Sequence, residues 1–169
     1  MNQLDDTCIE QQNDMIIFLD FDGVLHPNLD ESSHFCCAPL FWELLRRHPE
    51  ARVVFSTGWR FEHSVAQLGS LVCSNGGEDL AARFIDATPL LRHETEAGSR
   101  EKDCRAWLQA SNHTGPWLAL DDMRILFSRA ASNLYHVNPK RGLMPHDVER
   151  ISSLIRMATA GGKPVGRRA

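Results

Sequence analysis

Short apolar runs that end in polar residues constrain the fold of this 169-residue chain more than any other feature of its sequence. The first run, Met15–Leu19, is rich in β-prone residues and is followed by Asp-Phe-Asp-Gly. A continuous apolar run of this length is typical of a strand that is buried on both faces, as in a parallel sheet. Residues 53–55 end in the same way at Ser-Thr-Gly, and residues 117–120 end at Asp-Asp. We therefore predict buried parallel strands with polar residues at one end.

Amphipathic segments alternate with these runs along the chain. Helices are predicted at residues 39–48, 61–72, 99–110 (with Ser99 as N-cap) and 145–160, and two weaker strands at 84–85 and 134–137. Strands that alternate with helices form right-handed βαβ units. We therefore expect an α/β fold: a doubly wound, Rossmann-like parallel sheet with helices on both faces.

The composition is that of one ordinary globular domain, with 43% hydrophobic and 24% charged residues. We predict a single domain over residues 15–160, because no repeat or second core is visible. Residues 1–14 are polar and acidic and are expected to form a flexible leader. Residues 161–169 are rich in Gly and basic residues, and we expect a disordered basic tail.

Charge and cysteine usage exclude several classes of protein. Residues 1–45 hold nine carboxylates and no Lys or Arg, and the remainder holds 13 acidic against 18 basic residues. A general DNA-binding protein would be more strongly basic. The five cysteines are odd in number and form no C-x-x-C, which favours reduced thiols. Neither a signal peptide nor a membrane span is visible, so we expect a cytoplasmic protein with no membrane partner.

Polar clusters follow three of the predicted strands, at the edge of the sheet where such folds bind ligands. Asp20 and Asp22 come after the first strand, and side chains at i and i+2 converge if the extended geometry persists. Asp121 and Asp122 follow another strand, giving up to four carboxylates. Carboxylate oxygens suit Mg²⁺ better than Zn²⁺. A single Asp at such a position more often caps a turn or helix, but two pairs at two strand ends favour a metal site.

The third cluster offers groups that bind phosphate. Ser56 supplies a hydroxyl, and Thr57 and Gly58 precede a predicted helix whose backbone amides can hold phosphate oxygens. Arg60, and either Arg100 or Lys102 at the start of a later helix, could neutralise the remaining oxygens. Each of these residues alone is more often structural. Together with a metal site they point to phosphoryl transfer.

The order of these motifs resembles that of the haloacid dehalogenase (HAD) superfamily. The matching residues are Asp20-Phe21-Asp22-Gly23, Ser56, a basic residue that opens a helix, and Asp121-Asp122. Further features are similar to the HAD domains of Swiss Army Knife RNA-repair proteins: Ser56-Thr57-Gly58-Trp59-Arg60, Thr88-Pro89, Arg100-x-x-Asp103-x-x-x-Trp107-Leu108 and Gly142-Leu143. The four motifs cover residues 15–123.

This resemblance implies a Mg²⁺-dependent phosphatase that works through an aspartyl-phosphate intermediate. Asp20 would be the nucleophile, and Asp22 the general acid and base. Mg²⁺ would be held by Asp20, Asp22 (through its backbone carbonyl), Asp121 and Asp122. Ser56 would bind a phosphoryl oxygen, and Gly23 would let the backbone turn tightly beside the ligand.

Two basic residues compete for the third motif. The superfamily most often has Lys there, which favours Lys102, whereas the Arg-x-x-Asp spacing of the RNA-repair subgroup favours Arg100. We prefer Arg100. Asp103 stands where that subgroup usually has Glu.

The substrate is inferred from the room left for a cap domain. Both gaps in which the superfamily inserts caps already contain predicted core elements, so we expect a minimal cap or none. An open site suggests a large substrate reached at its end, such as RNA or DNA with a 3′-phosphate. Trp59 and Phe61 could stack on a terminal base, although core packing is the commoner role of such residues. A small-metabolite phosphatase and a catalytically silent HAD-like binding module are the alternatives.

Overall fold

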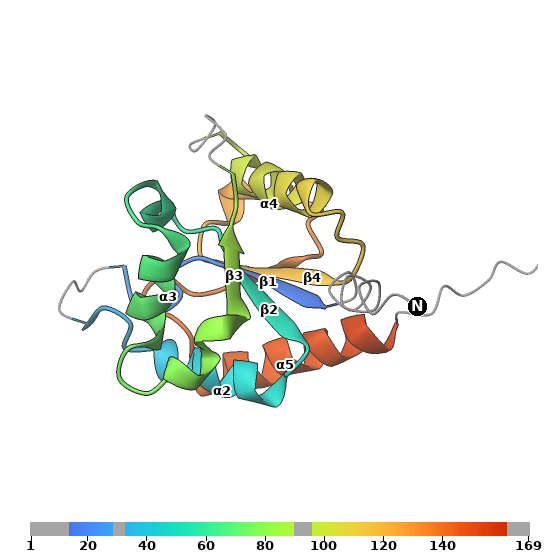
Figure 1. Cartoon of the computed structure of the whole chain (residues 1–169). Coiled ribbons are helices and arrows are strands. Elements are labelled where there is room, and N and C mark those ends of the chain that lie inside the picture. Colours follow the sequence, from blue (N-terminus) through green and yellow to red (C-terminus); the bar gives the residue numbers. More distant parts are fainter. Residues whose placement is uncertain (1–13, 29–32, 90–95, 162–169) are drawn as a thin grey trace, which may run out of the picture.

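The computed structural model describes residues 14–28, 33–89 and 96–161, and its centre is a five-stranded parallel sheet. The strands are β1 (Met15–Leu19), β2 (Ala51–Phe55), β3 (Phe84–Ala87), β4 (Trp117–Asp121) and β5 (Leu134–His136). Their order is β3-β2-β1-β4-β5, and every pairing is parallel (Figure 1). This order is that of a doubly wound sheet. The strands β1, β2 and β3 are added in one direction, and the chain then crosses back so that β4 and β5 lie on the other side of β1. The predicted α/β fold is confirmed.

Helices cover both faces of the sheet, as Figure 1 shows. The described residues form the α-helices α2 (Ala38–Arg47), α3 (Val65–Cys73), α4 (Ser99–Ala110) and α5 (Pro145–Ala160). They also form the short 3-10 helices η2 (Gly58–Phe61), η3 (Glu78–Arg83) and η4 (Arg124–Leu126). Neither connection in which HAD proteins carry caps contains an inserted domain within these residues.

The alternation of side chains along β1 divides the core in two. Met15, Ile17 and Leu19 pack into the larger cluster, to which α2, α3 and α5 contribute. Ile16 and Phe18 point to the other face, where α4 and η4 cover them. All five side chains are buried, which explains why this strand is an unbroken apolar run.

Two predicted helix boundaries were wrong for identifiable reasons. The helix predicted over residues 61–72 is divided into η2 and α3, because Ser64 caps α3: the amide of Gln67 donates to Ser64 Oγ at 3.3 Å. Ser99 is the first residue of α4 rather than its N-cap, a position that Gly98 holds with a φ of 78°. The other predicted elements are present, with ends that differ by a few residues.

The ends of the chain bear on the predicted domain boundaries. The acidic leader and the basic tail lie outside the described residues apart from Asp14 and Gly161, and the boundaries remain predictions. Within the described residues, no helix combines the length and the apolar character needed to cross a membrane.

Candidate active site

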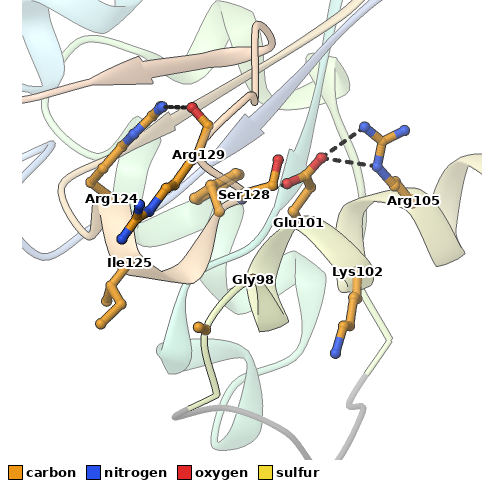
Figure 2. Close-up of a pocket in the computed structure, with 10 residues that line it drawn as sticks. Gly98, Glu101, Lys102, Arg105, Arg124, Ile125, Ser128 and Arg129 are labelled. Carbon is orange, nitrogen blue, oxygen red and sulfur yellow. Dashed lines mark hydrogen bonds and ion pairs between the residues drawn. The ribbon is translucent and has the colours of Figure 1, made fainter.

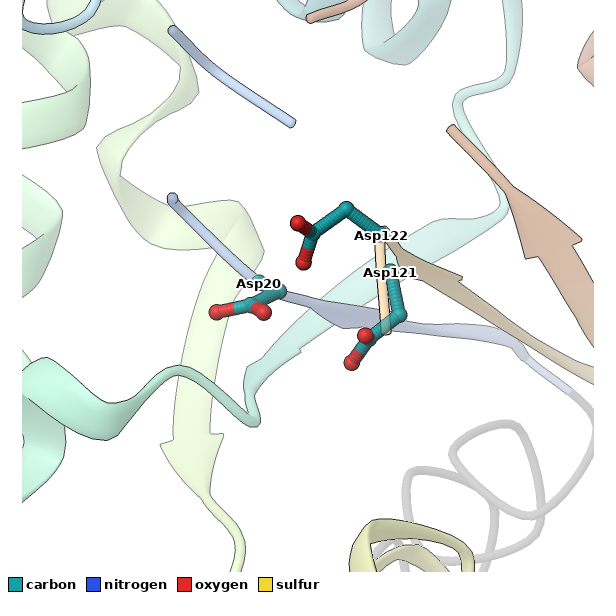
Figure 3. Close-up of side chains that lie close together, drawn as sticks. All are labelled: Asp20, Asp121 and Asp122. Carbon is teal, nitrogen blue, oxygen red and sulfur yellow. The ribbon is translucent and has the colours of Figure 1, made fainter. Parts of the chain in front are cut away.

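Three carboxylates meet at the carboxyl ends of two neighbouring strands. Asp20 follows β1, Asp121 ends β4, and Asp122 comes directly after it. One carboxylate oxygen from each residue lies within 4.8 Å of the others, and all three residues are buried (Figure 3). β1 and β4 are hydrogen-bonded neighbours, so the sheet itself brings these residues together. A cluster of this kind could hold a metal ion.

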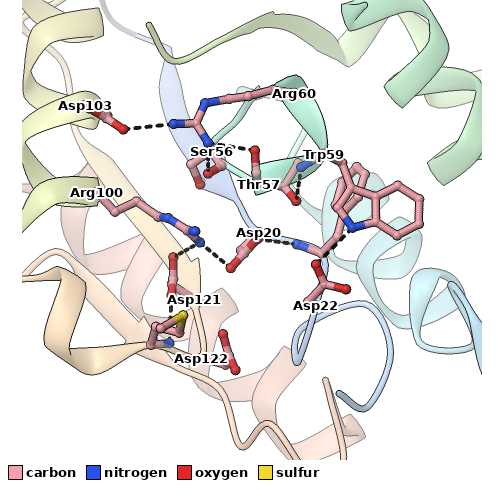
Figure 4. A network of polar contacts seen from close by, with 12 residues as sticks. Asp20, Asp22, Ser56, Thr57, Trp59, Arg60, Arg100, Asp103, Asp121 and Asp122 are labelled. Carbon is pink, nitrogen blue, oxygen red and sulfur yellow. Dashed lines mark hydrogen bonds and ion pairs between the residues drawn. The ribbon is translucent and has the colours of Figure 1, made fainter. Parts of the chain in front are cut away.

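Arg100 joins two of these carboxylates from α4. Its Nη1 donates to Asp121 Oδ2 at 2.8 Å and is also hydrogen-bonded to Asp20 Oδ2 (Figure 4). Burial favours a lower pKa for Arg100, but the charges of Asp20 and Asp121 outweigh it and raise the pKa above its usual value. Lys102 turns away instead: its side chain is 59% exposed, and its Nζ lies 3.9 Å from Glu96 Oε2. Of the two candidates for the third motif, Arg100 is the one that contacts the carboxylates.

The carboxylates repel one another in spite of this arginine. Burial and then the charge of Asp20 raise the pKa of Asp121 to about 7, against the attraction of Arg100. Burial also raises the pKa of Asp122, although Asn28 Nδ2 donates to its Oδ2 at 2.7 Å. Additional positive charge at this place would stabilise the ionised forms, and hard oxygen ligands suit Mg²⁺. The donor set therefore fits a divalent cation.

The carboxylate of Asp22 does not join this cluster, contrary to the expectation that four carboxylates converge. The extended conformation ends at Leu19, and the chain then turns: the amide of Val24 donates to the carbonyl of Phe21 at 3.0 Å. The Asp22 side chain is 53% exposed and points toward Trp59. Trp59 Nε1 donates to its Oδ2 at 2.9 Å, and His26 Nε2 lies 3.1 Å from its Oδ1.

These contacts set the charge state of Asp22. The hydrogen bond from His26, aided by that from Trp59, lowers the pKa of Asp22 although partial burial opposes the shift. His26 is itself held in place, because the amide of Phe35 donates to its Nδ1 at 3.3 Å. A ring that accepts at Nδ1 carries its proton at Nε2, so His26 is oriented to donate to Asp22.

Ser56 presents an unused hydroxyl at the end of β2, next to β1. The residue is 1% exposed, and its Oγ has no hydrogen-bond partner in the described part of the chain. A buried hydroxyl without a hydrogen-bond partner is rare, which suggests that a bound ligand supplies the missing hydrogen bond. Thr57 is buried and caps η2, accepting the amide of Trp59 at 3.3 Å, and Gly58 is the first residue of that short helix.

The guanidinium of Arg60, predicted to bind substrate, instead forms hydrogen bonds within the protein. Its Nη1 donates to the carbonyl oxygens of Ser56 and Thr57 at 2.9 and 2.7 Å. Its Nη2 donates to Asp103 Oδ2 at 2.9 Å. The buried guanidinium thus fixes the segment after β2 to α4, and its partner on α4 is Asp103.

A comparison with known families agrees with this geometry. Residues 16–148 match the model of a family described as the HAD domain in Swiss Army Knife RNA repair proteins. The chain belongs to this family. A search of curated proteins and a search of solved structures found no match. Membership confirms the resemblance and indicates a phosphatase-type function for this HAD domain.

Two polar contacts of the HAD domain were missed from the sequence. His26 and Asn28 lie in the segment after the first motif and hold Asp22 and Asp122, respectively. No spacing signal identifies them, because Asn28 meets a carboxylate 94 positions away. The half-buried Trp59 packs against Phe21 with ring centroids 5.7 Å apart, and its indole nitrogen donates to Asp22.

Proposed function

We propose that this HAD domain is a Mg²⁺-dependent phosphomonoesterase that works through an aspartyl-phosphate on Asp20. The observation that supports it most strongly is the cluster of Asp20, Asp121 and Asp122 with Arg100 hydrogen-bonded between two of its members. A structural cluster would gain nothing from three buried carboxylates that repel one another. A cluster that receives a cation and a phosphate needs that charge.

The metal would be held by the carboxylates of Asp20, Asp121 and Asp122 and by the backbone carbonyl of Asp22. When bound, Mg²⁺ would neutralise charge that otherwise repels the incoming phosphate, and would orient it. Asn28 and His136 support this site from outside: Asn28 holds the side chain of Asp122, and His136 Nε2 donates to the carbonyl of Asp122 at 2.8 Å.

In the first step, a carboxylate oxygen of Asp20 attacks phosphorus and the bond to the leaving oxygen breaks. The electron pair of that bond goes to the leaving oxygen, which takes a proton from the carboxyl of Asp22. Ser56 Oγ–H donates to a phosphoryl oxygen, and Arg100 stabilises the charge that develops on the phosphoryl group.

In the second step, water attacks the phosphorus of the aspartyl-phosphate. Asp22, now a carboxylate, accepts a proton from this water, inorganic phosphate leaves, and Asp20 is restored. The hydrogen bonds from His26 and Trp59 favour this ionised form. Asp22 is therefore better suited at rest to act as the base than as the acid.

We propose phosphorylated ends of RNA or DNA, with a 3′-phosphate as the leading case, as the substrate. The family description refers to RNA repair proteins. Within the described residues, no inserted domain covers the site, and this leaves room for a long substrate. A small-metabolite phosphatase would need neither feature.

The test is phosphate release from an aryl phosphate and from a 3′-phosphorylated oligonucleotide, each with Mg²⁺ and with chelator. Release should require Mg²⁺, and Asp20→Asn should lower it by at least about 10³-fold, because it removes the nucleophile. The matched control is Asp14→Asn. Asp14 precedes the opposite end of β1, and its Oδ2 lies 3.4 Å from Arg52 Nε. Preference for the aryl phosphate would favour a small-metabolite enzyme. No release by folded protein would favour the silent binding module.

A further inference from the structure

A groove with basic residues along it lies beside the site, between α4 and η4. Its volume is about 870 Å³, and it is bordered by Lys102 and Arg105 from α4 and by Arg124 and Arg129 from the region of η4 (Figure 2). We call it the α4–η4 groove. None of these four cations contacts Asp20, Asp121 or Asp122, and the proposed mechanism assigns none of them a role.

The groove is connected to the site through Ile125. This side chain lines the α4–η4 groove and also a smaller hollow of about 320 Å³ that is lined by Arg100. Phe61 and Met123 line the same hollow. These three apolar side chains are 43% (Phe61), 45% (Met123) and 65% (Ile125) exposed, an unusual concentration at the mouth of one hollow. A chain that leaves Arg100 can therefore pass over apolar surface into the groove.

The charge of the groove is positive. Among the described residues that line it, Glu101 is the one carboxylate, and it is already engaged: Arg105 Nη2 donates to its Oε1 at 2.7 Å, and the amide of Ser128 to its Oε2 at 2.7 Å. Beside the groove, Lys102 Nζ lies 3.9 Å from Glu96 Oε2, and an exposed pair of this kind is weak. Arg124 donates to the carbonyl of Arg129 at 2.8 Å, a bond that leaves its charge uncompensated. Arg129 is exposed, and its guanidinium has no hydrogen bond or ion pair with the part of the chain that the structure describes.

We propose that the α4–η4 groove binds the sugar-phosphate backbone of a single-stranded nucleic acid whose terminal phosphate lies at Asp20. The cations would contact successive phosphates, and the exposed side chain of Ile125 would contact sugar or base. The direction of the strand rests on the proposed function. The positive charge of the groove and the exposed apolar side chain of Ile125 do not depend on the proposed function. Binding to the groove can therefore be tested without catalysis.

Binding is measured by fluorescence anisotropy with a labelled single strand of about eight nucleotides, a length that one small domain can cover. All proteins carry Asp20→Asn so that no phosphate is released. The test variant adds Lys102→Ala and Arg129→Ala, which leaves the Arg105 and Arg124 hydrogen bonds intact. The control adds Arg46→Ala and Arg156→Ala instead; these exposed arginines lie on α2 and α5, on the other face of the sheet, so the same charge is removed.

The groove variant should bind at least about tenfold more weakly at low salt. Its slope of log affinity against log salt should be less steep by about 1.4, since each lost phosphate contact accounts for about 0.7 in a single strand. The control pair should stay close to the parent protein in both respects. Equal losses in both pairs, or equally strong competition by a polyglutamate peptide, would overturn the groove assignment. Groove-dependent binding by the Asp20→Asn proteins, together with no phosphate release by the wild-type protein, would instead overturn the proposed function alone.

Discussion

Gly23 backs directly onto the carboxylate of Asp122: a Cβ at Gly23 would lie 2.5 Å from Asp122 Oδ2. Nonbonded heavy atoms do not approach so closely. Gly23 also has a φ of 71°, in the left-handed region that other residues rarely adopt. The turn after β1 and the end of β4 can therefore meet only with glycine here. This contact places Asp122 beside Asp20.

Gly23→Ala should consequently damage the site. The added methyl displaces Asp122, and the backbone strain alone costs about 1–2 kcal/mol of stability. We expect a lower thermal midpoint. The proposed site also predicts that Mg²⁺ stabilises the wild-type protein, and Gly23→Ala should lose most of this effect. Thermal unfolding with and without Mg²⁺ measures both effects.

Gly58→Ala is the matched control for stability. A Cβ at Gly58 meets no heavy atom within 4 Å, and its φ is not positive. The thermal midpoint should stay near that of the wild type. A similar drop in both variants would show that Gly23 matters only as a flexible residue.

Arg100→Met should destabilise the protein in a pH-dependent way. Removing one partner of a buried ion pair leaves the other uncompensated, at a cost of about 3–5 kcal/mol. The pKa of Asp121 is raised to about 7, so this carboxyl is largely protonated at pH 5, and the loss should be smaller at pH 5 than at pH 8. Denaturant unfolding at the two pH values measures the difference. Arg100→Lys keeps the charge and should recover most of the stability; a pH-independent loss would contradict the role of Arg100 in balancing these carboxylates.

The fold and the cluster of three carboxylates could be predicted from the sequence because both depend on local patterns. Buried strands such as Met15–Leu19 are continuous apolar runs, and a parallel sheet brings their carboxyl ends to one edge. Asp20, Asp121 and Asp122 could therefore be placed together without knowing the strand order in detail. Ser56 follows from the same rule, at the end of β2.

The orientation of individual side chains could not be predicted in this way. Asp22 turns from the cluster because the backbone bends after Leu19, and no pattern marks that bend except Gly23. Arg60 lies in the right motif, but its guanidinium is taken up by backbone carbonyls and Asp103. Arg100 and Lys102 differ by two helical positions and so face different directions, which only the placement of α4 resolves.

Stability without metal should fall as the pH rises. In the folded protein the pKa of Asp121 is raised to about 7, while in the unfolded chain it is near 3.8. The folded state thus binds the proton more tightly, and the stabilisation this gives below pH 4 is lost as the pH rises through 7. Unfolding free energies in chelator at pH 5 and pH 8 measure the decline. Asp121→Asn should reduce it, and a stability that rises over this interval would contradict the raised pKa.

Trp59→Phe should change how Asp22 works while leaving the fold intact. The substitution removes the Nε1–H donor to Asp22 and keeps an aromatic ring against Phe21. One hydrogen bond fewer to the carboxylate raises the pKa of Asp22, so the acidic limb of the pH–rate profile should move to higher pH. At neutral pH we expect kcat to fall about fivefold with little change in KM, in keeping with about 1 kcal/mol for one hydrogen bond. Trp117→Phe is the control: this half-buried indole begins β4, at the opposite end of the strand from Asp121, and packs on Phe18. An acidic limb that stays in place in Trp59→Phe, or that moves equally in both variants, would show that Trp59 does not position Asp22.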